Sequence, residues 1–346
     1  MEELKLLAEK LQDSKKYNFT KLADVINNYI SNKSKDVNMI EYYLDYLIDC
    51  IYDDNSLKYA YDVCDYLEKL DEVSGNLYRT TLNKYYSECK KKIMRWFMKA
   101  LITGASSGIG KDMAIYLSEL GYDIILVSRE EDKLKEVKSE LKTKSKIIVM
   151  DLKEKDNCIK LYEMTKKENI DILVNNAGFG EFGEFVNTPL QKELDMIDVN
   201  VVAVHILTKL FLKDFVKRDS GYILNVSSSA AFQAGPLMST YYGTKAYVLR
   251  LTTAIYQELK HDKSNVHISV LCPGPVKTNF NNVANVKFEI KSTTSDYVAK
   301  YAIDKMFKNK LIIIPTLYMK LGIFFSKLAP TNLMLKIAYN IQNKKR

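Results

Sequence analysis

The sequence predicts an α/β protein in which a doubly wound parallel sheet of about seven strands follows a small all-α domain. Two observations lead to this prediction. Only one of the 13 glycines and none of the six prolines precede residue 98, although half of the 24 tyrosines do. After that residue, short β-branched runs alternate with amphipathic stretches, which is typical of a parallel sheet with helices on both faces. The 346 residues are enough for two domains.

Residues 1–97 are predicted to be entirely helical. Helices are expected over 2–12, 18–31, 37–52, 56–70 and 75–95, with polar breaks at 53–55 and 74–76 between the later ones. The third helix has the clearest period, since one face carries Ile40, Tyr43, Leu44, Leu47, Ile48 and Ile51. Residues 36–72 contain eleven acids and two lysines. This predicts a solvated face on a helical bundle or, alternatively, a surface that docks onto the basic second part or onto a basic partner. That partner is unknown.

Residues 98–346 are predicted to form the α/β domain. Its strands are expected at 100–103, 123–128, 146–150, 171–175, 222–227, 267–271 and 311–314. Ligands of such sheets bind beyond the carboxyl ends of the strands, so the functional residues are expected there. Residues 279–346 are expected to form a substrate lid and a basic, apolar C-terminal region.

The net charge of +8 is concentrated near the C-terminus, where residues 305–346 hold nine Lys or Arg and no acid. Residues 317–328 can form an amphipathic helix with Lys320 and Lys327 on one stripe. Three alternatives remain for 311–346: packing against the domain core or a second copy, peripheral contact with an anionic membrane, and binding of an anionic carrier. Charged residues and Pro315 interrupt 311–329, so a membrane-spanning helix is not expected.

Other classes of function find little support in the composition. Five widely spaced cysteines without a Cys-x-x-Cys pair, and three histidines, predict no metal site and no disulfide framework. The Met-Glu-Glu-Leu-Lys start is not a secretory signal, so a cytoplasmic setting is expected. The positive charge accompanies no recognised nucleic-acid motif, so no nucleic-acid partner is expected.

A glycine-rich loop directly follows the first expected strand and precedes a helical stretch. Its cofactor-binding residues are predicted to be Thr103, Gly104, Ser106, Ser107, Gly108, Ile109 and Gly110. Such a turn bends sharply, lets the backbone approach a pyrophosphate and presents a helix amino end to it. The second strand ends at Ser128 and Arg129, where an acid would bind a ribose hydroxyl. An arginine there pairs with a phosphate, so NADP(H) is favoured over NAD(H); the alternative is a surface charge at a helix start.

The loop spacing Thr-Gly-x-x-x-Gly-x-Gly resembles that of the short-chain dehydrogenase/reductase family. Further segments agree, in the expected order over about 99–315: Asp151-Leu152, Asn176-Ala177-Gly178, Asn200, Ser228 with Tyr241-x-x-x-Lys245, and Pro273-Gly274-Pro275-Val276-Lys277-Thr278. Six other Tyr-x-x-x-Lys matches lack a preceding strand that ends in serines. The resemblance implies a Rossmann-type fold and says nothing about residues 1–97.

The resemblance also implies roles for single residues. Tyr241 would be the general acid/base, and Lys245 would lower its pKa and hold the nicotinamide ribose. Ser228 would polarise the carbonyl oxygen, and Asn200 would anchor a water that links Lys245 to solvent. The remaining cofactor contacts would be Asp151 and Leu152 at the adenine, Asn176, Ala177 and Gly178 along the ribose and nicotinamide, and Pro273, Gly274, Val276 and Thr278 over the carboxamide.

These observations predict an NADP(H)-dependent oxidoreductase that interconverts a carbonyl and a secondary alcohol. Aromatic and methionine residues in 279–346 favour a moderately apolar substrate, a ketone or a 3-oxoacyl compound. The alternative is a non-catalytic NADP(H)-sensing adaptor whose helical domain binds a protein. Dimers and tetramers are usual in the family, and the helical extension leaves the oligomeric state open.

Overall fold

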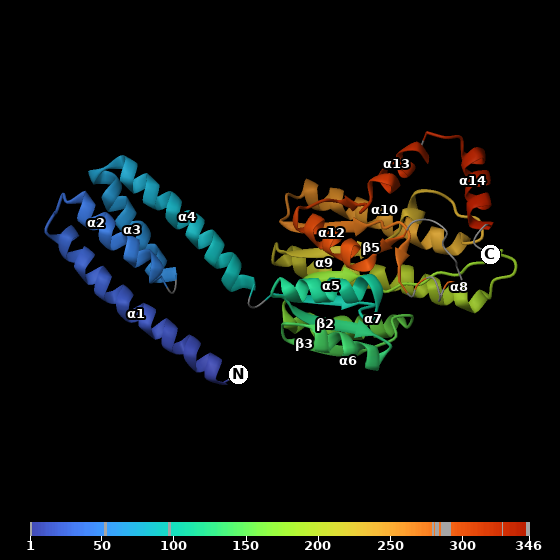
Figure 1. Cartoon of the computed structure of the whole chain (residues 1–346), viewed down its shortest axis with the longest axis horizontal. Helices are drawn as coiled ribbons and strands as arrows, with labels where there is room; N and C mark the ends of the chain where they lie inside the picture. The colour runs from blue at the N-terminus through green and yellow to red at the C-terminus, as the bar shows by residue number, and fades with distance from the viewer. Residues whose placement is uncertain are drawn as a thin grey trace. The chain divides into compact units, whose positions relative to one another are not determined.

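The computed structural model describes residues 2–51, 54–95, 98–278, 280, 284, 292–326 and 328–343 (Figure 1). The chain divides into two compact units, Met1–Met94 and Arg95–Arg346. The family resemblance belongs to the second unit.

The first unit is a bundle of helices. Its described elements are α1 (Glu2–Ser31), α2 (Val37–Asp49), α3 (Asp54–Leu70) and α4 (Glu72–Arg95). Leu44 and Leu47 of α2 pack with Ile26, Leu67 and Leu82 from the other three helices, and all five side chains are fully buried. The stripe predicted on the third expected helix therefore forms the centre of the bundle.

Two of the predicted breaks in this unit are wrong. The break between residues 12 and 18 is absent because α1 is continuous; the polar residues there include neither Gly nor Pro and are compatible with a helix. The break predicted at 74–76 lies inside α4, which begins earlier because the Asp71 carboxylate accepts from the Ser74 hydroxyl and N–H. Gly75 is required by packing: a Cβ there would lie 2.4 Å from the Glu68 Cα of α3.

The second unit is built on a seven-stranded sheet in the order β3-β2-β1-β4-β5-β6-β9, and every described pairing is parallel. The strands are β1 (Lys99–Thr103), β2 (Asp123–Ser128), β3 (Ser145–Val149), β4 (Ile170–Asn175), β5 (Gly221–Val226), β6 (Val266–Leu271) and β9 (Ile312–Ile313). The predicted doubly wound sheet is confirmed. Its strand order reverses between β1 and β4, which is where such sheets bind ligands.

A second, two-stranded parallel sheet was not predicted. It pairs β7 (Val276–Lys277) with β8 (Thr293–Thr294) and closes the segment that follows the Pro-Gly motif. Two residues per strand are too few to give a periodic signal in the sequence.

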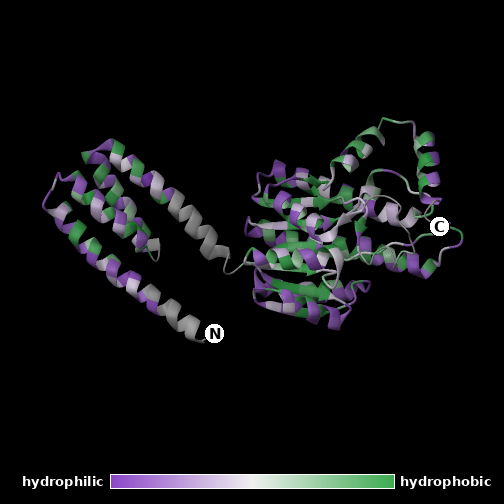
Figure 2. Cartoon of the chain, viewed as in Figure 1, coloured by the Kyte–Doolittle hydropathy of each residue, from purple (hydrophilic) through white to green (hydrophobic). Residues whose placement is uncertain are grey.

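Helices cover both faces of the large sheet, whose strands are almost continuously hydrophobic (Figure 2). They are α5 (Gly108–Glu119), α6 (Glu131–Glu140), α7 (Lys155–Thr165), α8 (Leu190–Ile197), α9 (Val204–Lys217), α10 (Ser239–His261) and α12 (Ser295–Phe307). On β1, Ile102 packs into a core with Met113 of α5, whereas its neighbour Leu101 packs into a second core with Phe211 of α9. Successive side chains of a strand point to opposite faces, so one strand supplies both cores.

The C-terminal region forms two further helices, α13 (Leu317–Ser326) and α14 (Thr331–Asn343). Of the predicted stripe, Lys320 lies on α13, whereas Lys327 lies outside the described residues. Within the described ranges, no helix has both the length and the apolar run needed to cross a bilayer.

Candidate active site

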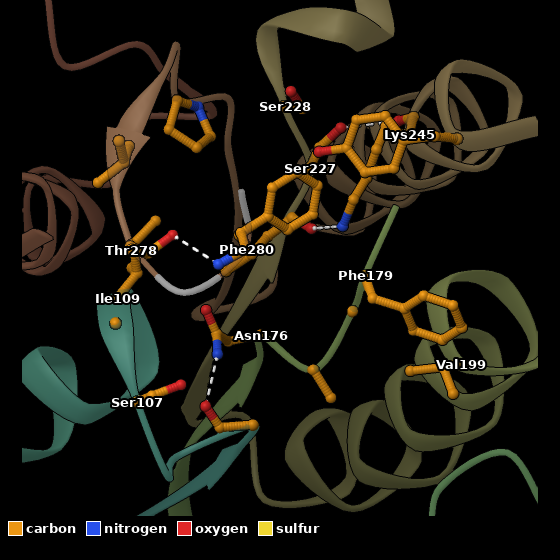
Figure 3. A pocket seen from close by; sticks show the side chains of 18 of the residues that line it. Ser107, Ile109, Asn176, Phe179, Val199, Ser227, Ser228, Lys245, Thr278 and Phe280 are labelled. Atoms are coloured by element: carbon orange, nitrogen blue, oxygen red, sulfur yellow. Dashed lines mark hydrogen bonds between the residues drawn. The ribbon is translucent and has the colours of Figure 1, made fainter. Parts of the chain in front are cut away.

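A cavity of about 630 Å³ lies where β1, β2, β4 and β5 end. Of the site residues predicted from the sequence, all line this cavity except three: Thr103, Gly110 and Asn200. Figure 3 shows Ser107, Ile109 and Thr278 on one side of the cavity and Ser228 and Lys245 on another. Segments more than 100 residues apart in the chain therefore meet around one space.

The glycine loop takes a conformation that requires glycine. Gly104 and Gly108 have φ of +63° and +55°, a region that side chains with a Cβ rarely adopt. The side chain of Ser107, at the start of α5, makes no capping hydrogen bond. The first N–H groups of α5 are therefore not capped by it, and a helix amino end of this kind binds anions.

Asn176 ties this loop to the end of β4. Its Nδ2 donates to the carbonyl oxygens of Thr103 (3.1 Å) and Gly104 (3.0 Å). In return, the Thr103 hydroxyl accepts from the N–H groups of Asn176 (3.0 Å) and Ala177 (3.1 Å). A Cβ on Gly110 would lie 2.3 Å from the Gly104 carbonyl oxygen. Thr103 and Gly110 thus support the cavity wall from behind.

Arg129 lies at the end of β2 and is the most exposed cation of this part of the cavity, at 66% of its side chain. Its guanidinium is 3.7 Å from the Asp151 carboxylate. Beside it, Glu130 accepts from the Ser106 hydroxyl, which in turn accepts from Ser128. Glu130 was not predicted to line the site, because an acidic residue at the start of a helix is common and belongs to no recognised motif.

Tyr241 and Lys245 lie one turn apart on α10 and are both buried. Lys245 Nζ donates to the Val226 carbonyl oxygen (2.9 Å) at the end of β5. The two neighbouring serines have different tasks. Ser227 donates to the backbone oxygen of Lys245 (2.7 Å) and so fixes the helix, whereas Ser228 interacts with the Tyr241 hydroxyl.

The pKa of Tyr241 is raised in this structure, although a lysine nearby was expected to lower it. Burial raises the pKa of Tyr241 to about 12, and the hydrogen bond with Ser228 opposes the rise. Lys245 Nζ is 5.9 Å from the centre of the tyrosine ring and is directed to Val226 instead. Burial also lowers the pKa of Lys245, to about 8.

Asn200 is fully buried in a π-helical turn, Asp198–Ala203, between α8 and α9. Its carboxamide donates to the Phe179 carbonyl oxygen (2.9 Å) and to Thr244 (3.1 Å), and accepts from the Phe179 N–H (3.1 Å). A Cβ on Gly178 would lie 2.8 Å from the Asn200 oxygen and 3.2 Å from Lys245 Nζ. Glycine at 178 therefore lets Asn200 and Lys245 approach the same backbone segment.

The end of the cavity nearest Tyr241 is largely apolar. An apolar pocket with side chains from residues 279–346 was expected, and Phe280 belongs to that stretch, whereas Phe179, Met238 and Gln342 were not predicted. Phe179, Met238 and Phe280 line it, and the Phe280 ring centre is 5.4 Å from that of Tyr241. Gln342 reaches it from α14 and donates to the Tyr242 hydroxyl (2.6 Å). The first three adjoin recognised motifs, but nothing in the sequence links Gln342 to a residue 100 positions away. In the described parts of the chain, no group of three or more His, Cys, Asp or Glu could hold a metal.

Comparisons with known proteins agree with this geometry. Residues 98–287 match the family model described as short chain dehydrogenase. The chain is 35% identical over 181 residues to a very-long-chain 3-oxoacyl-CoA reductase of Coccidioides immitis, covering 50% of this chain and 51% of that protein. It is 37% identical over 172 residues to a reductase of the same name from Bos taurus, covering 46% and 54%. The chain thus spans about half the length of these curated relatives.

A solved structure is similar over most of the second unit. It is described as a short-chain dehydrogenase from Sphingobium yanoikuyae in complex with NADPH. The match has a TM-score of 0.61 and 26% identity, and it covers 68% of this chain and 94% of that one.

Proposed function

The chain belongs to the short chain dehydrogenase family, and from this we propose that it is an NADP(H)-dependent reductase that converts the 3-oxo group of an acyl thioester into a secondary alcohol. The observation that carries the proposal is the convergence of Ser228, Tyr241 and Lys245 on one end of a cavity whose other end is a glycine loop. The names of the two reductase relatives support the substrate class.

The cavity fits a dinucleotide. The positive-φ glycines Gly104 and Gly108 and the open amino end of α5 would hold the pyrophosphate. Asp151 and Leu152 would border the adenine, and Val276 and Thr278 would lie near the nicotinamide. When bound, the cofactor supplies the hydride. Arg129 would pair with a 2′-phosphate, which is the basis for proposing NADP(H).

Tyr241 would donate the proton. Reduction adds a hydride to the carbonyl carbon and a proton to its oxygen, and the proton comes from the Tyr241 hydroxyl. A pKa of about 12 keeps this phenol protonated at neutral pH, which is the form that a proton donor needs. Ser228, which interacts with the same hydroxyl, would hold the carbonyl oxygen next to it. Lys245 would bind the nicotinamide ribose and, as a cation, favour transfer of the tyrosine proton.

The apolar end of the cavity supports a lipophilic substrate. Phe179, Met238 and Phe280 offer an apolar surface beside the proton donor. A 3-oxoacyl chain would place its carbonyl at Tyr241 and its alkyl part against these side chains.

The test is NADPH oxidation with 3-oxoacyl-CoA substrates of several chain lengths, with simple ketones as comparison. Tyr241→Phe is expected to abolish most turnover while keeping the fold. Tyr247→Phe is the matched control, because Tyr247 lies on the same helix and its hydroxyl contacts His205, outside the cavity. Turnover that is equal in wild type and Tyr241→Phe would contradict the mechanism; turnover of ketones but not of thioesters would contradict the substrate class.

A further inference from the structure

The two C-terminal helices expose large apolar side chains. On α13, Phe324 and Phe325 are 59% and 62% exposed, and Leu328 just beyond the helix is 68% exposed. Single exposed apolar residues are common, but several in sequence on one short helix mark a surface that contacts something apolar. Figure 2 shows hydrophobic residues along both helices.

The second helix, α14, has two distinct faces. Leu333, Ile337 and Ile341 follow one another at intervals of four residues, and all three are exposed. Ala338 and Gln342 lie on another face and are buried. The buried face holds the helix on its unit, so the apolar stripe stays on the outside.

The charge of this region selects the partner. No acid occurs between residues 305 and 346, whereas Lys320 on α13 and Lys336 on α14 are exposed beside the apolar stripes. The Lys320 ammonium also donates to the Tyr301 hydroxyl of α12 (3.2 Å), which leaves its charge unpaired. Apolar side chains bordered by lysines match the surface of a bilayer with anionic headgroups, which attracts each lysine and accepts the apolar groups. A solely apolar partner would leave these lysines without complementary charge.

Both helices also contact the catalytic cavity. Gln342 of α14 lines it and donates to Tyr242, the neighbour of Tyr241. On α13, Met319 lies against Gly274 of the cavity wall, since a Cβ there would be 2.8 Å from the Met319 Cγ. Gln342 thus connects α14 to the cavity directly, whereas Met319 of α13 packs behind the wall residue Gly274.

We propose that α13 and α14 form the surface on which this protein rests on an anionic lipid bilayer, and that an acyl substrate passes from the bilayer into the cavity beside Gln342 of α14. Membrane binding does not depend on the proposed function, whereas substrate delivery rests on it.

Flotation with vesicles tests the first half. The full chain is mixed with phosphatidylcholine vesicles that contain either no phosphatidylserine or about one third of it. We expect binding to the anionic vesicles, reduced at least about tenfold by Phe324→Ser with Phe325→Ser, because two large side chains no longer enter the bilayer. Lys320→Gln with Lys336→Gln should weaken binding to anionic vesicles only, about fivefold to thirtyfold.

The matched control is Ile159→Ser with Met164→Ser. These two apolar residues of α7 are about half exposed and belong to the same unit, and their replacement should leave flotation unchanged. Circular dichroism and thermal melting check that every variant is folded. Failure of the wild type to float, or equal flotation of the Phe324/Phe325 variant, would overturn the proposal. Self-association in solution that this variant abolishes would also overturn it, by assigning the surface to a second copy.

Kinetics test the second half. Anionic vesicles should lower KM for a 3-oxoacyl-CoA of about 16 carbons at least threefold and leave KM for one of four carbons unchanged. The Phe324/Phe325 variant should lose the difference while keeping kcat for the short substrate. Unchanged KM for the long substrate would contradict delivery from the bilayer. If no thioester is reduced at all, the proposed function fails, and the flotation result still stands by itself.

Discussion

Tyrosines with a raised pKa have different roles in the two units. In the first unit, burial raises the pKa of Tyr59 to about 12, and its hydroxyl donates to the Ala23 carbonyl oxygen (3.0 Å) and to Asn27 (2.9 Å). In the second unit, burial raises the pKa of Tyr241 to the same value, but this side chain lines a cavity with Lys245. A raised pKa alone therefore does not identify a catalytic tyrosine. What distinguishes Tyr241 is an available space beside the hydroxyl.

The largest expected effect is a difference in kcat between variants of Tyr241 and Tyr59. Tyr241→Phe should lower kcat for reduction by about 10²- to 10⁴-fold, because the proton donor is lost. Tyr59→Phe should leave kcat unchanged and cost the first unit about 1 kcal/mol, because the half-buried contacts of its hydroxyl are lost. Steady-state kinetics and urea unfolding of both variants measure the contrast. Equal kinetic effects of the two substitutions would contradict it.

A substitution in the first unit should have the opposite effect: it should lower stability and leave the activity unchanged. Leu44→Ala removes a fully buried side chain from the first unit and should lower the free energy of unfolding of that unit by about 2–5 kcal/mol. The reductase activity should not change, because the described residues that line the cavity all belong to the second unit. Thermal unfolding with activity measured on the same samples tests this; a fall in kcat that parallels the destabilisation would show that the units depend on each other.

The proposed preference for NADP(H) rests on one exposed charge, that of Arg129. Arg129→Ala should lower the ratio of kcat/KM for NADPH to that for NADH roughly 10- to 100-fold, since a charge-assisted hydrogen bond contributes about 1.5–3 kcal/mol. Lys133→Ala, four residues further on and paired with Glu130, is the control that removes a nearby cation. A wild type that prefers NADH would show that Arg129 does not bind a phosphate.

The pH profile should show the smallest effect. Burial places the pKa of Lys245 at about 8, so its ammonium is charged below that pH and neutral above it. Tyr241 stays protonated until about pH 12 and adds no loss in this range. We expect kcat/KM for reduction to be constant below pH 8 and to fall by up to about tenfold per pH unit above it. A profile that is flat between pH 7 and 10 would contradict a role for the lysine cation.

In the second unit, the elements with a regular apolar pattern or a recognised motif could be predicted from the sequence. All seven strands of the large sheet were expected within about one or two residues, because buried parallel strands are continuous apolar runs. The polar site was expected because Thr103 ends its strand, and Asn176 and Ser228 follow theirs, in the order of recognised motifs. An apolar contribution from residues 279–346 was also expected, and Phe280 supplies one. Phe179 and Gln342 were not expected, because they share no spacing with the motifs and are brought there by tertiary packing.

The first unit was predicted less well at its boundaries. The period of α2 located its core, but α1 has only weak amphipathic order over its 30 residues. Polar residues near position 15 therefore resembled a loop. Gly75 resembled a turn as well, although it serves the close contact between α3 and α4. Local signals of this kind cannot distinguish a turn from a tight helix crossing.

The short pairing of β7 with β8 makes the segment between these strands tolerant of changes in length. It joins residues 276–277 to 293–294 and so fixes both ends of the segment between them. Lengthening a segment whose ends are already held costs little, about 0.6 kcal/mol of closure entropy for each doubling of its length. Changes of length between these two strands should therefore cost little stability, and because Phe280 of this stretch lines the cavity beside Tyr241, they would reach the apolar end while the glycine loop keeps its geometry.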